Sequence, residues 1–190
     1  MQTIELQKVA SQVRRDILRQ VHGCQSGHPG GSLGCTDLLV ELYFNSMNLK
    51  SDVSGQVEFH MDGLNEDVFF LSNGHISPLL YSVLARRGYF PVAELASFRK
   101  LNTRLQGHPT PHEHLEGIRI ASGSLGQGLS VAIGVAQAKK LNGDSSTVYC
   151  LMGDGEQNEG QVWEAAMYAP HHNVNNLIAF IDENGQQIDG

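Results

Sequence analysis

The chain has 190 residues, with 13 Lys and Arg against 20 Asp and Glu, and its net charge is −7. This length suits one domain with a substantial core, and 41% hydrophobic residues with 17% charged ones is typical of a globular protein rather than a disordered one. The acidic balance leaves no broad basic surface, which excludes nucleic acid and acidic lipid as expected partners.

The first half of the chain predicts mainly helices. Apolar residues recur at helical spacing over 6–21, which indicates an amphipathic helix, and after a glycine-rich turn a second helix is expected over 36–44 with Thr36 as its N-cap. The apolar run 68–72 precedes turn residues and predicts a buried strand. Helices over 76–87 and 91–100 follow, and 101–119 is expected to be a loop.

The stretch 120–138 contains no charged residue and approaches the length of a membrane span. Its Ser and Gln residues are too polar for lipid, so we expect a buried helix with its entry loop and no membrane segment. The N-terminus carries charges throughout and lacks the apolar core of a signal peptide. Three cysteines without a C-x-x-C spacing predict a reduced, cytoplasmic protein.

The last third of the chain has the clearest pattern. Strands are predicted over 147–152 and 176–182, with a turn and a helix over 160–171 between them. Short connections make this a β-α-β unit, which forces the strands to be parallel. We therefore expect an α/β fold in a single domain over 1–190, with a mostly parallel sheet and helices on both faces. Because such a sheet normally needs more strands, either the domain is short or the sheet is completed elsewhere.

Polar residues follow both predicted strands of this unit. Asp154 comes after the first strand and Asn184 after the second, and ligands of parallel sheets bind beyond these carboxyl ends. Oxygen donors of this kind suit Mg²⁺ or Ca²⁺, and a phosphate commonly completes the metal's coordination. Gly153 and Gly155 would let backbone N–H groups approach that phosphate. The pieces predict a diphosphate–metal site, with an ordinary Gly-Asp-Gly turn as the alternative.

Other phosphate motifs are absent, because the sequence has neither a P-loop nor the third glycine of a dinucleotide fingerprint. Three histidines, His28, His75 and His108, each lie beside a glycine at a break between elements, where an imidazole can bind a small molecule or move protons. His112 and His114 lack the further ligands of a zinc site, so we interpret them as solvated loop residues.

Together these motifs resemble the N-terminal, diphosphate-binding region of the thiamine diphosphate-dependent transketolases. The matching stretches run in the family's order: SGHPGGSLG (26–34), LSNGHISPLLYSVL (71–84), FRKL with GHP (98–109), GSLGQGLSVAIGVA (123–136), and GDGEQNEGQVWEA (153–165) through IDENGQQIDG (181–190). SNGH distinguishes transketolases from deoxyxylulose-5-phosphate synthases, which are similar through GDG. Ser124 replaces the Pro of many full-length transketolases, so here the chain resembles the N-terminal subunits of split transketolases.

The resemblance implies a role for each matching residue. Asp154, Asn184 and the backbone carbonyl of Gln186 correspond to the metal ligands. His28 and His108 match substrate-channel histidines that contact sugar hydroxyls and assist proton transfer. Glu159 matches the acid that couples the two cofactor sites of the dimer. The residues that would lie beside or contact the thiamine diphosphate are His75, Gly123, Ser124, Leu125, Gly153 and Gly155.

The implied reaction is the transfer of a two-carbon ketol group from a ketose phosphate to an aldose phosphate, as in the pentose phosphate pathway. In this family a pyrimidine-binding domain, which this chain lacks, supplies the carboxylate that activates the cofactor. We therefore expect a transferase subunit that is inactive alone. It would need a C-terminal subunit carrying the pyrimidine domain, and it would also self-associate, giving a homodimer or a heterotetramer.

The early stop after Gly190 leaves two alternatives open. Beside the subunit of a split enzyme, the chain could be a non-catalytic remnant that acts as a binding or assembly module, or a shortened piece of a longer natural chain. The five retained residues Asp154, Asn184, His28, His75 and His108 argue against a remnant. Phosphate recognition in this family relies partly on basic residues outside this chain, so the resemblance leaves the length and stereochemistry of the sugar phosphates open.

Overall fold

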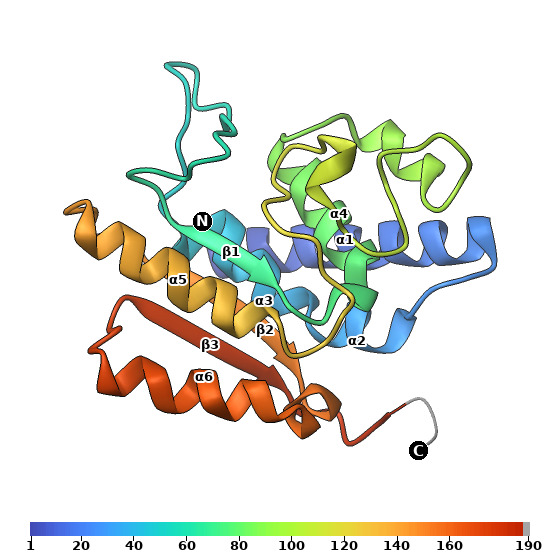
Figure 1. The fold of residues 1–190 in the computed structure, drawn as a ribbon. Helices are drawn as coiled ribbons and strands as arrows, with labels where there is room; N and C mark the ends of the chain where they lie inside the picture. Colours follow the sequence, from blue (N-terminus) through green and yellow to red (C-terminus); the bar gives the residue numbers. More distant parts are fainter. Residues whose placement is uncertain (188–190) are drawn as a thin grey trace. The chain divides into compact units, whose positions relative to one another are not determined.

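A computed structural model describes residues 1–187, and they form two compact units. The first unit joins Met1–Met61 with His75–Ala121, and the second joins Asp62–Gly74 with the chain from Ser122 onward. Figure 1 shows the elements of both units along the chain. None of the helices in the described part of the chain combines the length and the apolar character that a membrane span requires.

The first unit is helical. Its α-helices are α1 (Thr3–Cys24), α2 (Pro29–Gly34), α3 (Thr36–Glu41) and α4 (Ser77–Arg87). A π-helical turn η1 (Leu42–Ser46) continues α3, and the 3-10 segments η3 (Val92–Ser97) and η4 (Pro111–Glu113) lie further along the chain. The short 3-10 segment η2 (Gly74–Ile76) leads from the second unit into α4.

The long helix α1 packs against α3 and α4. Its buried face contains apolar side chains, as the periodicity predicts, but also the carboxylate of Asp16 and the amide of Gln20. Asp16 is 2.7 Å from the Arg86 guanidinium of α4, and Gln20 donates a hydrogen bond of 2.7 Å to the Ser82 hydroxyl. Because buried polar groups need partners, these bonds set how α1 and α4 pack against each other.

Three local predictions for this unit were wrong. Thr36 is not an N-cap, because Cys35 holds that position and the Thr36 hydroxyl donates to the carbonyl of Ser32 at 2.9 Å. The glycine-rich turn after α1 contains the short helix α2, which begins at Pro29, a residue whose fixed φ favours the first helical position. The helix expected over 91–100 is the 3-10 segment η3.

The second unit contains a parallel sheet in the order β1-β2-β3, formed by β1 (Val68–Leu71), β2 (Val148–Gly153) and β3 (Leu177–Asp182). Its helices are α5 (Gly128–Leu141), the 3-10 turn η5 (Gly155–Asn158) and α6 (Gly160–His171). The predicted β-α-β unit and its parallel strands are confirmed, and the fold class is α/β. The uncharged stretch forms the loop before α5 and most of α5, which continues past it to a buried Lys139. The helix is only partly buried, contrary to expectation, because Ser130, Val131 and Gly134 are exposed.

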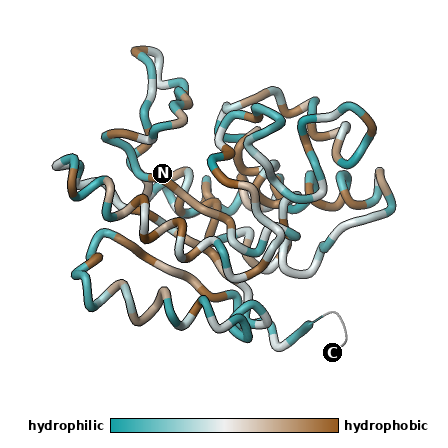
Figure 2. The backbone as a smooth tube through the Cα atoms, in the orientation of Figure 1, coloured by the Kyte–Doolittle hydropathy of each residue, from teal (hydrophilic) through white to brown (hydrophobic). Residues whose placement is uncertain are grey.

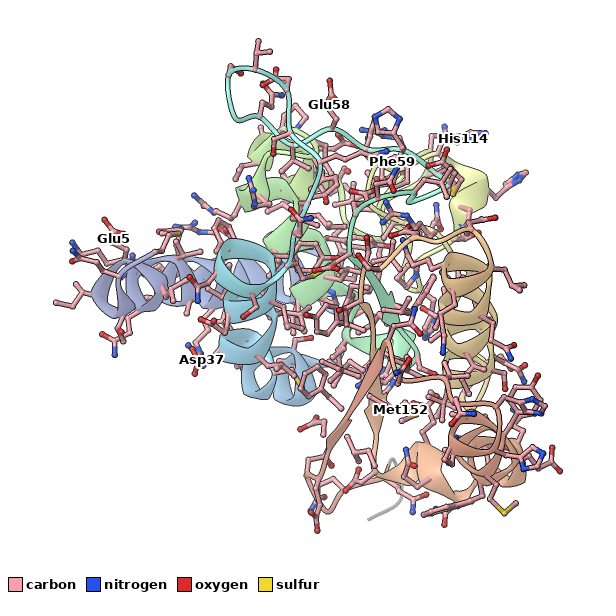
Figure 3. The ribbon with its side chains drawn as sticks, turned by 90° about the vertical axis from the view of Figure 1, so that its left-hand side faces the viewer. Glu5, Asp37, Glu58, Phe59, His114 and Met152 are labelled. Carbon is pink, nitrogen blue, oxygen red and sulfur yellow. The ribbon has the colours of Figure 1, made fainter. Side chains whose placement is uncertain are left out.

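Strand register assigns the side chains of β2 and β3 to the two faces of the sheet. Met152 pairs with Ile181, and both line an apolar hollow of about 370 Å³ together with residues of α5 and α6. Figure 3 shows Met152 on this helix-covered side. On the other face, the rings of Tyr149 and Phe180 stack with centroids 6.5 Å apart. Figure 2 shows that β1 is hydrophobic along its length and that the segment after β3 is hydrophilic. The polar residues of this region therefore follow the end of β3.

Candidate functional site

The carboxyl ends of β2 and β3 meet at one edge of the sheet. Asp154 directly follows β2, and its backbone N–H donates to the carbonyl of Asp182, the last residue of β3, at 3.1 Å. The Asp154 carboxylate accepts hydrogen bonds from the N–H groups of Gly185 at 2.6 Å and Gly155 at 2.9 Å. Parallel strands bring these residues together because both strands end on the same side.

Asn184 lies in the same loop, where its side-chain oxygen accepts a hydrogen bond of 2.8 Å from the N–H of Gln186. Its amide nitrogen donates to the carboxylate of Asp182 at 3.2 Å. The predicted ligand residues Asp154, Asn184 and Gln186 thus share one network of hydrogen bonds. In the described chain the side-chain oxygens of Asp154 and Asn184 are bonded to backbone N–H groups of the same loops.

The donor set at this edge fits a hard divalent cation. Hydrogen bonds from Gly185 and Gly155 lower the pKa of Asp154, so its carboxylate is ionised at neutral pH. A carboxylate, an amide oxygen and backbone carbonyls are the ligands that Mg²⁺ and Ca²⁺ prefer. Within residues 1–187 no three His, Cys, Asp or Glu side chains gather in a cluster, so a metal here would depend on amide, carbonyl or phosphate oxygens beside the one carboxylate.

Two buried polar atoms lie close to this edge. The Asn73 side-chain oxygen and the Ser122 hydroxyl are buried and have no hydrogen-bond partner among the described residues. Asn73 follows β1 by two residues, and its Cβ lies 3.9 Å from the position that a Cβ at Gly153 would occupy. Since buried polar atoms are normally paired, these two fit a site that receives a polar ligand.

The segments predicted to hold a cofactor pack tightly around the same edge. A Cβ at Gly126 would lie 2.8 Å from the Cβ of Glu159, and one at Gly128 would overlap the Cβ of Ser72. Gly126 also has a φ of +85°, which other residues rarely adopt. Glycine at 126 and 128 therefore has a structural reason: the 122–128 loop lies directly against the end of β1 and the start of α6.

The other predicted cofactor residues lie on these segments. Gly123 has a φ of +126°, Ser124 is exposed, and the carbonyl of Leu125 accepts a hydrogen bond from the Gln161 side chain at 3.3 Å. A Cβ at Gly155 would meet the Gln187 side chain at 3.0 Å. Glu159, at the N-cap of α6, is exposed.

Glu156 was missed in the sequence, although it is a deeply buried charged residue of this region, with 2% of its surface exposed. Its carboxylate accepts hydrogen bonds from the Ser72 hydroxyl, from the Gly126 N–H at 2.7 Å and from the Gly153 N–H at 3.1 Å. From the sequence alone, a glutamate in a polar turn is expected to be exposed to solvent. The one available signal was its position inside the glycine-rich turn that follows a buried strand.

The predicted histidines lie in the first unit. The rings of His28 and His75 are in edge-to-face contact, with centroids 5.0 Å apart. Partial desolvation, together with the charges of Arg99 and His28, lowers the pKa of His108, so its imidazole is neutral at pH 7. All three histidines therefore belong to one neighbourhood of this unit. His112 and His114 lie at or beside the exposed turn η4.

Arg99 is a second residue that sequence reasoning missed. It has a φ of +59°, and its Nε is buried without a partner among the described residues. A Cβ at Gly107 would lie 2.7 Å from the centre of its guanidinium, so a side chain at 107 would require the guanidinium to move. Its Nη1 donates to the Ser26 hydroxyl at 3.2 Å, and the cation also lies 5.5 Å from the ring centroid of Phe98.

Comparisons with known proteins agree on one family. The family model described as the thiamine diphosphate binding domain of transketolase matches residues 6–190. The chain is 40% identical over 189 residues to the 6-deoxy-6-sulfo-D-fructose transketolase subunit SqwG of Clostridium sp. (strain MSTE9), covering all of this chain and 66% of that protein. It is 36% identical over 190 residues to one of the apulose-4-phosphate transketolase subunits of Phocaeicola vulgatus, covering all of this chain and 64% of that protein.

Full-length relatives and solved structures give the same result. Human transketolase is 38% identical over 182 residues, which are 27% of its length. The crystal structure of transketolase from Campylobacter jejuni superimposes with a TM-score of 0.86 at 33% identity, covering all of this chain and 30% of that one. The chain therefore spans about two thirds of the similar subunits and less than a third of the full-length proteins.

Proposed function

The chain belongs to the transketolase family through its thiamine diphosphate-binding domain, and we propose that it is the diphosphate- and metal-binding part of such an enzyme. The reaction we propose is the transfer of a two-carbon ketol group from a ketose phosphate to an aldose phosphate. The relatives named above that match this chain over its whole length include subunits, so a split enzyme with a separate C-terminal subunit is the form we propose.

One observation carries this proposal. The Asp154 carboxylate after β2 and the loop after β3 are joined by a hydrogen bond of 2.6 Å to Gly185, beside Asn184. Ligands of parallel α/β sheets bind at the carboxyl ends of the strands, and an ionised carboxylate there favours a cation. We propose that Asp154, the Asn184 oxygen and the Gln186 carbonyl hold Mg²⁺ or Ca²⁺.

The resemblance to the family also supports a set of cofactor residues. The chain at Gly153 and Gly155 would approach the diphosphate closely, since neither residue has a side chain in the way. The 123–125 segment would lie beside the rings of thiamine diphosphate, His75 would donate to the diphosphate, and Glu159 would couple the two sites of a dimer. When bound, the cofactor supplies a carbon nucleophile that also acts as an electron sink.

The chain's own contribution to the chemistry is positioning and proton handling. A neutral His108 can accept a proton from a sugar hydroxyl, because one ring nitrogen carries a free lone pair at pH 7. We propose that His28, in ring contact with His75, donates to a second hydroxyl and so orients the substrate. Both histidines keep the sugar in place while the acceptor replaces the donor.

We propose that a partner chain completes the site. We propose that a chain with a pyrimidine-binding domain supplies the carboxylate that activates the cofactor, and that the isolated chain has no transfer activity. Exposed apolar side chains on α6 and β3, including Trp163 and Met167 with 56% and 68% of their surfaces exposed, support contact with another protein. The three cysteines carry free thiols, which favours a reducing compartment, and we propose the cytoplasm.

The test combines calorimetry with an activity assay. Thiamine diphosphate should bind to the chain mixed with its C-terminal partner in the presence of Mg²⁺, and the mixture should turn over a ketose phosphate. The chain alone should show no turnover. Asp154→Ala should abolish Mg²⁺-dependent binding, whereas the surface variant Asp37→Asn should keep it, because Asp37 pairs with Arg14 in the first unit. Binding without turnover by the complete mixture would favour a non-catalytic binding module instead.

A further inference from the structure

The buried carboxylate of Glu156 connects three segments of the second unit that are far apart in the sequence. Ser72 follows β1, Gly126 lies in the loop before α5, and Gly153 ends β2, and each donates a hydrogen bond to Glu156. These three donors are neutral groups rather than cations. A buried carboxylate in such a place is stabilised only by the hydrogen bonds from these donors.

The network extends one step beyond the carboxylate. The Ser72 hydroxyl that donates to Glu156 also accepts a hydrogen bond of 3.1 Å from the N–H of Gly128, the first residue of α5. The start of α5 is therefore attached to Glu156 through Ser72. This bond uses one of the helix N–H groups that has no partner within the helix itself.

Close packing of the same segments makes this arrangement stiff. A Cβ at Gly74 would lie 2.5 Å from the Ser122 hydroxyl and 2.8 Å from the Gly123 nitrogen. The turn after β1 thus lies directly against the start of the 122–128 loop. With no room for side chains at 74, 126 or 128, the loops have few alternative positions in which Glu156 keeps its three donors.

We propose that Glu156 is a positioning residue that holds the three cofactor-binding loops of the second unit in their binding arrangement before the cofactor arrives. This inference rests on the proposed function and adds to it a residue that contacts neither metal nor diphosphate. It also gives the serine of the SNGH motif a role as the link between Glu156 and α5. Preorganised loops raise affinity because less ordering is required on binding.

The test compares Glu156→Gln with a matched control. Glutamine keeps the size of the side chain but places an NH₂ group against one of the two backbone N–H donors, so one hydrogen bond must be lost. Asp144→Asn changes another buried carboxylate of the same unit, which accepts from Lys139, Asn65 and Ser146 before the amino ends of β1 and β2 rather than at their carboxyl ends. Both variants lower stability, and only the first should affect cofactor binding.

Three readouts separate the possibilities, each measured on the chain with its C-terminal partner. Calorimetry with thiamine diphosphate and Mg²⁺ should show affinity about tenfold or more weaker for Glu156→Gln, the loss that a single hydrogen bond can produce, and unchanged for Asp144→Asn. Amide exchange without cofactor should be faster at Gly126 and Gly153 in Glu156→Gln alone. Thermal unfolding should show both variants folded.

Each other outcome has a definite meaning. Wild-type affinity in Glu156→Gln, or an equal loss in Asp144→Asn, would overturn the inference and leave the proposed function standing. Failure of the wild-type mixture to bind thiamine diphosphate would overturn the proposed function, and the inference with it. If Glu156→Gln does not fold, Ser72→Ala, which removes one donor, should reproduce the affinity loss, and its failure to do so would overturn the inference.

Discussion

The imidazole rings of His28 and His75 lie in edge-to-face contact, with centroids 5.0 Å apart and an interplanar angle of 65°. The two residues are separated by 47 positions in the chain (75 − 28), and both belong to the first unit. His28 precedes α2 and His75 lies just before α4, and these helices are in contact. Packing of the helices therefore brings together two histidines that the sequence places in separate motifs.

Replacing His28 tests its role toward the substrate. His28→Asn should lower kcat/KM for a ketose phosphate about 10²-fold, the usual contribution of a positioned acid or base, while thiamine diphosphate affinity stays the same. Steady-state kinetics and calorimetry on the mixture with the C-terminal partner measure the two effects. His22→Asn, an exposed histidine in the last turn of α1, is the matched control and should leave both values unchanged.

The cation of Arg99 should affect the titration of His108. Burial, then Arg99, then His28 lower the pKa of His108, so Arg99→Met should raise that pKa toward its ordinary value of 6.5. Lys100→Met removes a neighbouring exposed charge and should leave the pKa of His108 unchanged. An NMR titration of the His108 ring gives both values, and an unchanged pKa in Arg99→Met would show that the cation has no influence.

The lowered pKa of His108 also makes the free energy of unfolding depend on pH. Because the folded protein binds a proton at His108 less readily than the unfolded chain, protonation favours unfolding between the lowered pKa and the ordinary value of 6.5. Stability from this residue is complete above that window and is lost as the pH falls through it. Arg99→Met should narrow the pH interval between the two pKa values. Chemical unfolding between about pH 5 and about pH 7 would detect this as a weaker pH dependence of the free energy of unfolding.

The buried pair of Lys139 and Asp144 should make the second unit sensitive to acid. The two groups are 2.8 Å apart, with 3% and 6% of their residue surfaces exposed. Burial raises the pKa of Asp144, but hydrogen bonds from Lys139 and Ser146 outweigh it and hold the pKa well below the ordinary 3.8. The ionised carboxylate of Asp144 therefore stabilises the fold fully above pH 3.8, and this stabilisation is lost as the pH falls through the lowered pKa.

Asp144→Asn should reduce the free energy of unfolding at pH 7 by about 3–5 kcal/mol, because it leaves a buried ammonium without its counter-charge. Urea unfolding measures this loss, and the difference from wild type should shrink as the pH falls below 3.8. Asp37→Asn, which breaks the more exposed pair with Arg14, should cost about 1 kcal/mol or less. Equal effects of the two variants would contradict the prediction.

The three thiols should differ in reactivity. Cys150 lies in β2 with none of its surface exposed, and burial, helped by the charge of Glu156, raises its pKa to about 12. Cys35 is also buried, whereas Cys24 is partly exposed. An aromatic disulfide reagent at about pH 8, near the ordinary thiol pKa, should modify Cys24 in the native protein and all three thiols after unfolding. Cys24→Ser should remove the native reaction, and rapid labelling of that variant would contradict this assignment.

Much of the second unit could be predicted from the sequence because its signals are local. Apolar runs marked β1, β2 and β3, and short connections made β2-α6-β3 a parallel unit. Parallel strands end on the same side, so Asp154 and Asn184 were expected at one edge of the sheet. The proximity of Asp154 to the loop of Asn184 follows from strand direction alone.

Other features could not be predicted, because they depend on contacts between distant segments. Threonine is a residue type that favours the N-cap position, but the Thr36 hydroxyl donates a hydrogen bond to the carbonyl of Ser32 in the preceding helix. The guanidinium of Arg99 lies against Gly107, a contact that requires the loop between them to fold back. Neither pairing leaves a periodic or spacing signal in the sequence.

Sequence alone determined the strands, the glycine turns and the polar residues that end them, since periodicity and turn chemistry act over a few neighbouring residues. Tertiary structure decided that Glu156 is buried rather than solvated, because its donors come from Ser72, Gly126 and Gly153, up to 84 positions away. A carboxylate enters the interior only where donors from separate segments converge, and that convergence exists only in the folded chain.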